Sequence, residues 1–181
     1  MNVVLAYVEQ SDFRVFGRLS GWKPPRWFRW WMLWATRLGD GWIWLATAIA
    51  LLSGGPGSLR VFAAAALGAA ITNAALVIMK RRFHRKRPYE YAENPYFDLA
   101  RLPYFPSDRF SFPSGHSMNA FAIGTVISLA FPSLAPVALL LAASIGASRV
   151  VLGFHFVSDV AVGSVLGSFI GGLAFLAVMG S

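Results

Sequence analysis

Five apolar stretches dominate the chain, at residues 42–52, 59–79, 112–131, 134–152 and 156–179. A helix needs about 20 apolar residues to cross the hydrocarbon core of a bilayer. The last four stretches approach that length, whereas residues 42–52 can span only if the turn before them adds to the helix. The pattern therefore predicts an all-α, polytopic transmembrane bundle with five spans.

Residues 27–37 fit two interpretations. Tryptophans and arginines alternate here, which is typical of a helix lying at the headgroup level. The alternative is a short sixth span, disfavoured because Arg29 and Arg37 bracket few apolar residues. The residues before Pro24 and Pro25 are mixed and basic, so we expect a surface tail there. Residues 1–40 are thus predicted as a basic tail followed by an interfacial or weakly transmembrane helix.

Composition agrees with a membrane protein. Of 181 residues, 56% are hydrophobic and only 13% are charged, which is too apolar for an ordinary soluble domain. We expect one domain over residues 1–181, without repeats. The net charge of +8 suggests an anionic lipid or substrate. Nucleic acid is disfavoured, because the basic residues lie between apolar stretches and no nucleic-acid-binding motif is present. The absence of cysteine excludes disulfides and thiolate chemistry, and charges near the N-terminus argue against a cleaved signal peptide.

Glycines in the last apolar stretch recur at close to helical spacing. They are Gly163, Gly167, Gly171 and Gly172. Small residues let membrane helices approach closely, so we expect these glycines to pack against another helix.

Ionisable residues at the ends of membrane helices indicate function, and the first such cluster runs from Lys80 to Arg87 and Pro88. It begins a polar segment, residues 80–111, that follows the second span. Taken alone, this cluster fits a basic anchor to anionic headgroups as well as a phosphate site.

The second cluster, residues 112–117, opens the third span. Pro113 suits a helix start, Ser114 can cap the helix or donate to a phosphate oxygen, and Gly115 lets the backbone approach a ligand. Backbone N–H groups at a helix N-terminus favour a phosphate. His116 follows at once, and its alternative role is a histidine hydrogen-bonded at a helix end.

The third cluster joins the last two spans and contains Arg149, His155 and Asp159. Residues four apart share one face of a helix, so the Asp159 carboxylate can reach the His155 ring. It would fix the tautomer and leave the other ring nitrogen free as a nucleophile. The alternative is a helix-capping salt bridge. Because two crossings separate the second and third clusters, all three clusters lie on one membrane face.

In this order and spacing, the three clusters resemble the complete signature of the type 2 phosphatidic acid phosphatase (PAP2) superfamily. The matching positions are Lys80 with Arg87-Pro88, Pro113-Ser114-Gly115-His116, and Ser148-Arg149 with His155 and Asp159. Phe154 and Phe156 depart from the pattern only between signature positions, which bears on substrate preference.

The resemblance implies a mechanism. His155 would attack phosphorus and form a phosphohistidine, oriented by Asp159, while His116 would protonate the leaving group and then activate water. The phosphate oxygens would be held by five residues. These are Lys80, Arg87, Ser114, Gly115 and Arg149. No cofactor or metal is implied, and no carboxylate cluster suited to Mg²⁺ is apparent. The sequence does not indicate an oligomeric state.

A site at the membrane face suits a lipid substrate, such as phosphatidic acid, phosphatidylglycerophosphate or a polyprenyl diphosphate. The aromatic residues of segment 89–110 fit an interfacial lid or a plain connecting loop. The positive-inside rule would make the site face cytoplasmic, because only Arg60 among the Lys and Arg residues lies opposite. The resemblance implies the periplasmic or outer face of a bacterial inner membrane, which we favour.

Three other functions compete with a hydrolase. A phosphotransferase would use the same residues with a lipid or sugar acceptor. Vanadate-dependent haloperoxidases resemble the family at the active site, but they are soluble and larger. A non-enzymatic membrane scaffold would not need His116, His155 and Asp159 together.

Overall fold

The structure is a computed structural model that describes residues 3–91 and 108–180, and no strand occurs in these ranges. Its α-helices are α1 (Val3–Gly21), α2 (Arg26–Arg37), α3 (Ile43–Leu52), α4 (Pro56–Phe83), α5 (Gly115–Ala130), α6 (Ala135–Val151) and α7 (Val157–Met179). The all-α class is confirmed. Helices α3 to α7 follow the five predicted apolar stretches in order.

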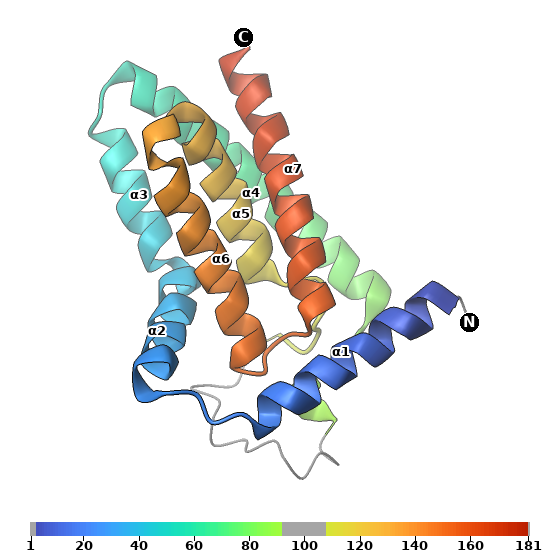
Figure 1. The fold of residues 1–181 in the computed structure, drawn as a ribbon. Helices are drawn as coiled ribbons and strands as arrows, with labels where there is room; N and C mark the ends of the chain where they lie inside the picture. Colours follow the sequence, from blue (N-terminus) through green and yellow to red (C-terminus); the bar gives the residue numbers. More distant parts are fainter. Residues whose placement is uncertain (1–2, 92–107, 181) are drawn as a thin grey trace.

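Three of the described helical segments are long and apolar enough to cross a membrane. They are Pro56–Glu90, Pro132–Val151 and Val157–Met179. Helices α3 and α5 are shorter, with 10 and 16 residues. Helix α5 nevertheless runs through the middle of the bundle, in contact with α4, α6 and α7 (Figure 1). The chain is therefore a multi-pass membrane bundle built around α5.

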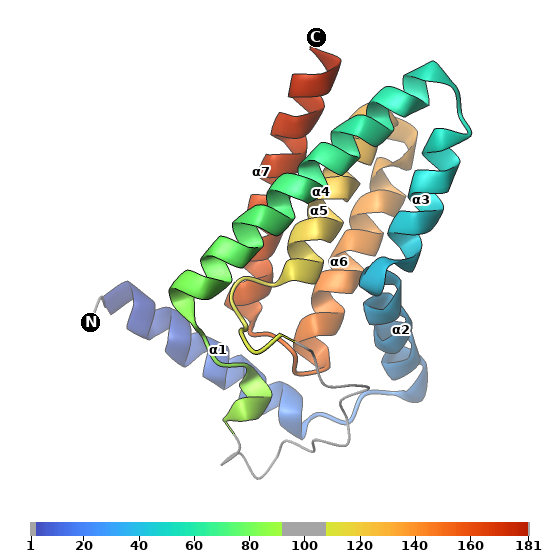
Figure 2. The same ribbon diagram turned by 180° about the vertical axis from the view of Figure 1, so that it is seen from behind.

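Helices α2 and α3 run end to end along one side of the bundle (Figures 1 and 2). The π-helical turn Leu38–Trp42 joins them, and Gly41 makes the kink with a φ of 133°. Glycine adopts such a φ without steric strain. The turn expected at residues 38–41 is thus a kink in a helix that continues in one direction. As a result, residues 27–37 lengthen α3 and do not return across the bundle as a separate span.

Helix α1 lies across the end of the bundle where α7 begins (Figures 1 and 2). Every fourth residue along its inner face, Asp12, Phe16 and Ser20, is buried. Phe13 and Phe16 contact the ring of Phe156 with centroids 5.2 and 6.1 Å apart. The expectation of a surface tail is therefore wrong for Val3–Gly21. The inner face mixes polar and apolar residues, so it shows no plain apolar stripe in the sequence.

Helices α5 and α7 pack at very short range. Three glycines of α7, each four residues from the next, face backbone carbonyls of α5 spaced in the same way. The pairs are Gly163 with Ser114, Gly167 with Met118, and Gly171 with Ala122. A Cβ on Gly167 or Gly171 would lie 2.2 Å from the facing oxygen. The predicted glycine packing is confirmed for these three, but not for Gly172, whose Cβ would meet nothing within 4 Å.

The neighbouring glycines 171 and 172 provide a matched test of this packing. Gly171→Ala should destabilise the fold by about 1–3 kcal/mol, because the added methyl group forces α5 and α7 apart. Gly172→Ala should be neutral or slightly stabilising, because alanine favours helix and the position is open. Thermal unfolding in detergent measures both, and equal midpoints for the two variants would contradict the close contact.

Candidate active site

The end of the bundle nearest α1 holds a cavity of about 520 Å³. Six of the eight predicted site residues line it. These are Lys80, Arg87, Gly115, His116, Arg149 and His155. They come from all three polar clusters, so the structure brings the clusters together as the span order requires.

Helix ends place these side chains. Lys80 lies in the last turn of α4, which ends where His84 takes a left-handed conformation with a φ of 48°. The chain then leaves the end of the bundle. Where it returns before α5, Ser111 N donates a hydrogen bond to Arg85 O at 2.8 Å, which holds the two segments together. Arg149 lies in the last turn of α6. The cavity is therefore bounded by helix termini, where backbone groups and side chains can both reach a ligand.

His155 lies in the connection between α6 and α7 and is only 2% exposed. Its Nε2 is 3.3 Å from Arg87 Nη1. Arginine has donors but no acceptor, so Nε2 must be the unprotonated ring nitrogen and Nδ1 carries the hydrogen. The lone pair of Nε2 is thus directed to the cation-lined side of the ring.

The opposite side of the His155 ring faces Asp159. Nδ1 lies 3.7 Å from Asp159 Oδ2 and 3.4 Å from the hydroxyl of Ser111. Ser111 itself donates to Asp159 Oδ2. The expectation that both residues share a helix face is wrong, because α7 begins after His155. The pair forms instead at the helix start, where Asp159 Oδ2 also accepts the Phe156 N–H at 2.8 Å, so the capping alternative holds as well.

The charge state of His155 follows from its surroundings. Burial of the ring lowers its pKa to about 3; the Asp159 contact opposes this shift, and the charges of Arg87 and Arg149 add to it. The imidazole is therefore neutral over the physiological pH range. A neutral ring with a free nitrogen is the form that can act as a nucleophile.

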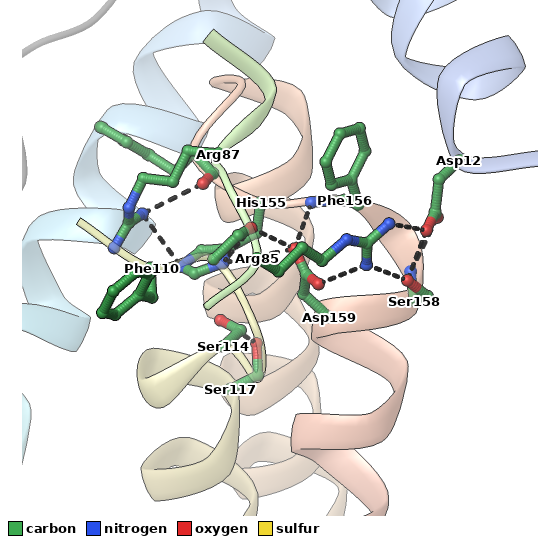
Figure 3. A network of polar contacts seen from close by, with 12 residues as sticks. Asp12, Arg85, Arg87, Phe110, Ser114, Ser117, His155, Phe156, Ser158 and Asp159 are labelled. Atoms are coloured by element: carbon green, nitrogen blue, oxygen red, sulfur yellow. Dashed lines mark hydrogen bonds and ion pairs between the residues drawn. The ribbon is translucent and has the colours of Figure 1, made fainter. Parts of the chain in front are cut away.

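Arg87 is buried, and each of its three guanidinium nitrogens has a hydrogen-bond partner. Nη1 donates to Phe154 O at 3.0 Å, Nε donates to Asp108 O at 3.0 Å, and Nη2 lies 3.3 Å from Asp108 Oδ2 (Figure 3 shows Arg87 beside His155). Lys80 Nζ forms an ion pair with the same carboxylate oxygen. Asp108 therefore balances two of the cavity's cations.

Arg149 is also buried, at 1% exposure. Its Nη1 donates to Thr36 Oγ1 of α2 at 2.5 Å, and its guanidinium lies over the Phe154 ring, 4.1 Å from the centroid. Phe154, noted in the sequence as a departure from the family pattern, thus supports a cation of the cavity.

His116, in the first turn of α5, meets the kink between α2 and α3. Its Nε2 lies 2.7 Å from Asp40 Oδ1. Gly39 makes this approach feasible, since a Cβ there would lie 2.8 Å from Ile145 and 3.0 Å from His116 Cδ2. The second histidine of the cavity therefore also has a carboxylate partner.

Ser114 and Asp159 do not line the cavity but lie fully buried behind its wall. Ser114 Oγ accepts from Ser117 Oγ at 3.0 Å, and Ser114 N donates to Asp159 O at 3.1 Å. This backbone bond joins the starts of α5 and α7. The arrangement gives Ser114 a framework position, in contrast to the phosphate contact expected from the sequence.

Several polar residues of this region were given no individual role in the sequence analysis, although Arg85 and Ser158 lie within its clusters. They are Asp12, Thr36, Asp40, Arg85, Asp108, Ser111 and Ser158. Asp40 had a usable signal, because it is one of only 8 acidic residues and stands beside an apolar stretch. The others are recognisable only from tertiary contacts. The proposed lid residues Tyr96, Phe97, Tyr104 and Phe105 lie outside the described residues.

Among residues 3–91 and 108–180, no group of three or more His, Asp or Glu side chains is placed to hold a metal ion. The cavity instead combines a neutral histidine, a second histidine paired with a carboxylate, and the cations Lys80, Arg87 and Arg149. Such a set can bind a phosphate group and pass it to a nitrogen nucleophile.

Known proteins are similar to this chain in sequence. Decaprenylphosphoryl-5-phosphoribose phosphatase of Mycolicibacterium smegmatis is 37% identical over 123 residues, which is 68% of this chain and 62% of the relative. Phosphatidylglycerophosphatase B of Bacillus subtilis is 39% identical over 103 residues, covering 51% of this chain and 50% of the relative. This chain thus matches less than two thirds of the length of either protein.

Solved structures share the fold. The crystal structure of Aquifex aeolicus LpxE aligns with a TM-score of 0.72 and 25% identity, over 87% of this chain and 91% of that one. A transmembrane PAP2-type phosphatidylglycerolphosphate phosphatase from Bacillus subtilis aligns with a TM-score of 0.67 and 26% identity, over 96% and 85%. Residues 58–180 match the family model of the PAP2 superfamily, and the chain therefore belongs to that superfamily.

Proposed function

We propose that this protein is a membrane-embedded, metal-independent lipid phosphatase that acts through a phosphohistidine at His155. The observation that carries the proposal is the buried, neutral His155, whose Nε2 faces a cavity lined by Lys80, Arg87 and Arg149. A single nucleophile beside three cations suits attack on an anionic phosphorus centre.

In the first step, the Nε2 lone pair of His155 forms a bond to phosphorus as the bond from phosphorus to the lipid oxygen breaks. His116, protonated on both ring nitrogens when the substrate is bound and paired with Asp40, donates one proton to the leaving oxygen and becomes neutral. In the second step, His116 takes a proton from water, the water oxygen bonds to phosphorus, and the bond to His155 breaks. Asp159 keeps the Nδ1 hydrogen in place and stabilises the positive ring.

The cations and the N-terminus of α5 hold the phosphate oxygens in this proposal. Lys80, Arg87, Arg149 and the Gly115 N–H supply donors to the charge that develops in the transition state. Phosphate takes the place of the Asp108 carboxylate, which pairs with Lys80 and Arg87 in the described structure. Ser114 contributes by tying α5 to α7.

A second, apolar cavity supports a lipid substrate. It has a volume of about 280 Å³, lies between α3, α5 and α6, and shares Trp44 and Ile123 with the polar cavity. We propose that it holds the start of the hydrocarbon tail. The two relatives are named as phosphatases of decaprenylphosphoryl-5-phosphoribose and of phosphatidylglycerophosphate, so a polyprenyl or diacyl phosphate is the proposed class.

The main test is release of inorganic phosphate in detergent from phosphatidic acid, phosphatidylglycerophosphate and undecaprenyl diphosphate. His155→Ala should lower turnover by at least about 10³-fold, because the variant lacks the group that forms the covalent intermediate. It should also lose an acid-labile, hydroxylamine-sensitive phosphoenzyme that the unaltered protein forms. Full activity in this variant would contradict the mechanism.

His116→Ala is the matched control in the same cavity, because it keeps the nucleophile. It should slow turnover by about 10²–10⁴-fold, the usual contribution of general acid–base catalysis, and let the phosphoenzyme accumulate. Transfer of the phosphoryl group to an added lipid or sugar alcohol, with no release of free phosphate, would show that the protein is a phosphotransferase and not a hydrolase.

Filling the apolar cavity should weaken binding of substrates with long hydrocarbon tails but not of substrates with short ones. Ala50 lines it, whereas Ala46 on the same helix does not. The ring introduced by Ala50→Phe should displace about two methylene groups of the lipid tail, each worth about 0.8 kcal/mol of binding free energy. The KM for a long-chain substrate should therefore rise about 10-fold. Ala46→Phe should have no effect, and neither variant should alter hydrolysis of a short-chain phosphate. An equal KM for long chains in both variants would exclude this tail site.

We place the cavity on the outer face of the bacterial inner membrane. Lys80, Arg85, Arg87 and Arg149 are engaged with carboxylates, hydroxyls and a carbonyl inside the protein. Because these cations have structural or binding roles inside the protein, they are poor markers of the cytoplasmic face under the positive-inside rule.

A chain without cysteine allows a clean test of this orientation. Helix α1 lies at the cavity end of the bundle, and the connection between α3 and α4 lies at the opposite end (Figure 1). In intact cells, a membrane-impermeant maleimide should label Gln10→Cys and spare Ser53→Cys. The reverse result would place the cavity on the cytoplasmic face.

A further inference from the structure

Asp159 has an ion-pair partner that does not line the cavity. Arg85 Nη1 donates to Asp159 Oδ1 at 2.6 Å, while Oδ2 accepts from Ser111 and from the Phe156 N–H. The guanidinium of Arg85 lies between Asp159 and Asp12, away from the His155 ring, as Figure 3 shows. It therefore contacts the carboxylate without contacting the space where a phosphate would bind.

Arg85 bridges Asp159 to the N-terminal helix. Its Nη2 donates to Asp12 Oδ2 of α1 at 2.7 Å, and its Nη1 also donates to Ser158 Oγ at 2.7 Å. The guanidinium lies over the Phe156 ring, 4.4 Å from the centroid. With two carboxylates, a hydroxyl and an aromatic face as partners, this side chain is held in one orientation.

Asp12 also binds the start of α7 directly. It is 4% exposed, its Oδ1 accepts the Ser158 N–H at 3.0 Å, and its Oδ2 accepts from the Ser158 hydroxyl. The first N–H groups of a helix lack partners within the helix, and a carboxylate satisfies one of them well. Asp12 thus caps α7 from a different helix, one residue from Asp159.

The inner face of α1 fixes Asp12 in turn. Phe13 contacts the rings of Phe156 and Tyr91, with centroids 5.2 and 4.9 Å apart. Phe156 follows His155 directly in the chain. Packing of α1 therefore bears on both neighbours of the proposed nucleophile, the aromatic residue after it and the carboxylate beside it.

We propose that Arg85, held by Asp12 of α1, is a positioning residue that fixes the Asp159 carboxylate beside His155, so that docking of α1 completes the active site. This inference rests on the proposed function. Loss of Arg85 would leave Asp159 with fewer fixed donors, and a carboxylate that rotates away from Nδ1 no longer orients the ring. Misplacing a reacting group by about 1 Å can lower a rate by about 10²-fold.

The test compares Arg85→Gln and Arg85→Lys with Arg82→Gln, which alters an exposed cation at the end of α4. Arg85→Gln should lower kcat by about 10²-fold with KM within about 2-fold, because the residue orients Asp159 but does not contact phosphate. Arg85→Lys should recover about 10-fold of that loss, since it restores the charge near Asp159. Arg82→Gln should match the unaltered protein.

The role of α1 is tested by Asp12→Asn against Glu9→Gln, an exposed carboxylate on the same helix. Asp12→Asn should lower kcat by about 10-fold, and adding it to Arg85→Gln should cause little further loss, because the two residues act through one link. Glu9→Gln should have no effect. Additive losses in the double variant would overturn the link between α1 and Asp159.

Inhibition by orthovanadate, a phosphate analogue, separates positioning from collapse of the site. Arg85→Gln should keep the vanadate inhibition constant of the unaltered protein, because Lys80, Arg87 and Arg149 remain in place. Loss of vanadate inhibition together with kcat, without recovery in Arg85→Lys, would show a purely structural role. An unaltered kcat in Arg85→Gln would overturn the role of Arg85 but leave the proposed function standing. No phosphate release by the unaltered protein would overturn both.

Discussion

The close contact between α5 and α7 is the constraint on which the rest of the site depends. Glycines 163, 167 and 171 have no side chain to hold the two helices apart, and the backbones meet at three points over about two helical turns. Both helices begin at the same end of the bundle, so the Ser114 N–H can bond to Asp159 O. Two positive helix ends therefore meet beside the two histidines. A bulkier residue at any of these glycines would move one histidine relative to the other.

Bringing so much charge together requires internal compensation. Lys80 and Arg87 share Asp108, and Arg85 pairs with both Asp12 and Asp159. A buried charge without a partner costs several kcal/mol, so these carboxylates are what make a dense cationic pocket compatible with folding. Lys80 and Arg87 already point toward an anionic oxygen, that of Asp108, which supports the proposed phosphate site.

The sequence predicted the parts of this architecture that are encoded locally. Apolar run length located α4, α6 and α7, and the turn at Pro113 located the start of α5. Counting spans placed Lys80, His116 and Arg149 at one end of the bundle. The sequence could not predict that α1 docks, because Asp12, Phe16 and Ser20 form no apolar stripe. Asp40 and Ser111 were missed for a related reason. Each meets a histidine distant in sequence, a contact that depends on the kink at Gly41 and on the path of the chain below α4.

The cations of the cavity have opposite effects on His155 before and after phosphate binds. In the described structure, burial, together with Arg87 and Arg149, holds its pKa near 3 and keeps Nε2 unprotonated. In the proposed mechanism, a bound phosphate would cancel much of that positive charge, so the ring could accept positive charge as its bond to phosphorus forms. Asp159 favours the same change from the Nδ1 side. Under the proposed function, the pocket would thus keep His155 neutral until the substrate binds, and the substrate's own charge would then make the positively charged phosphohistidine more accessible.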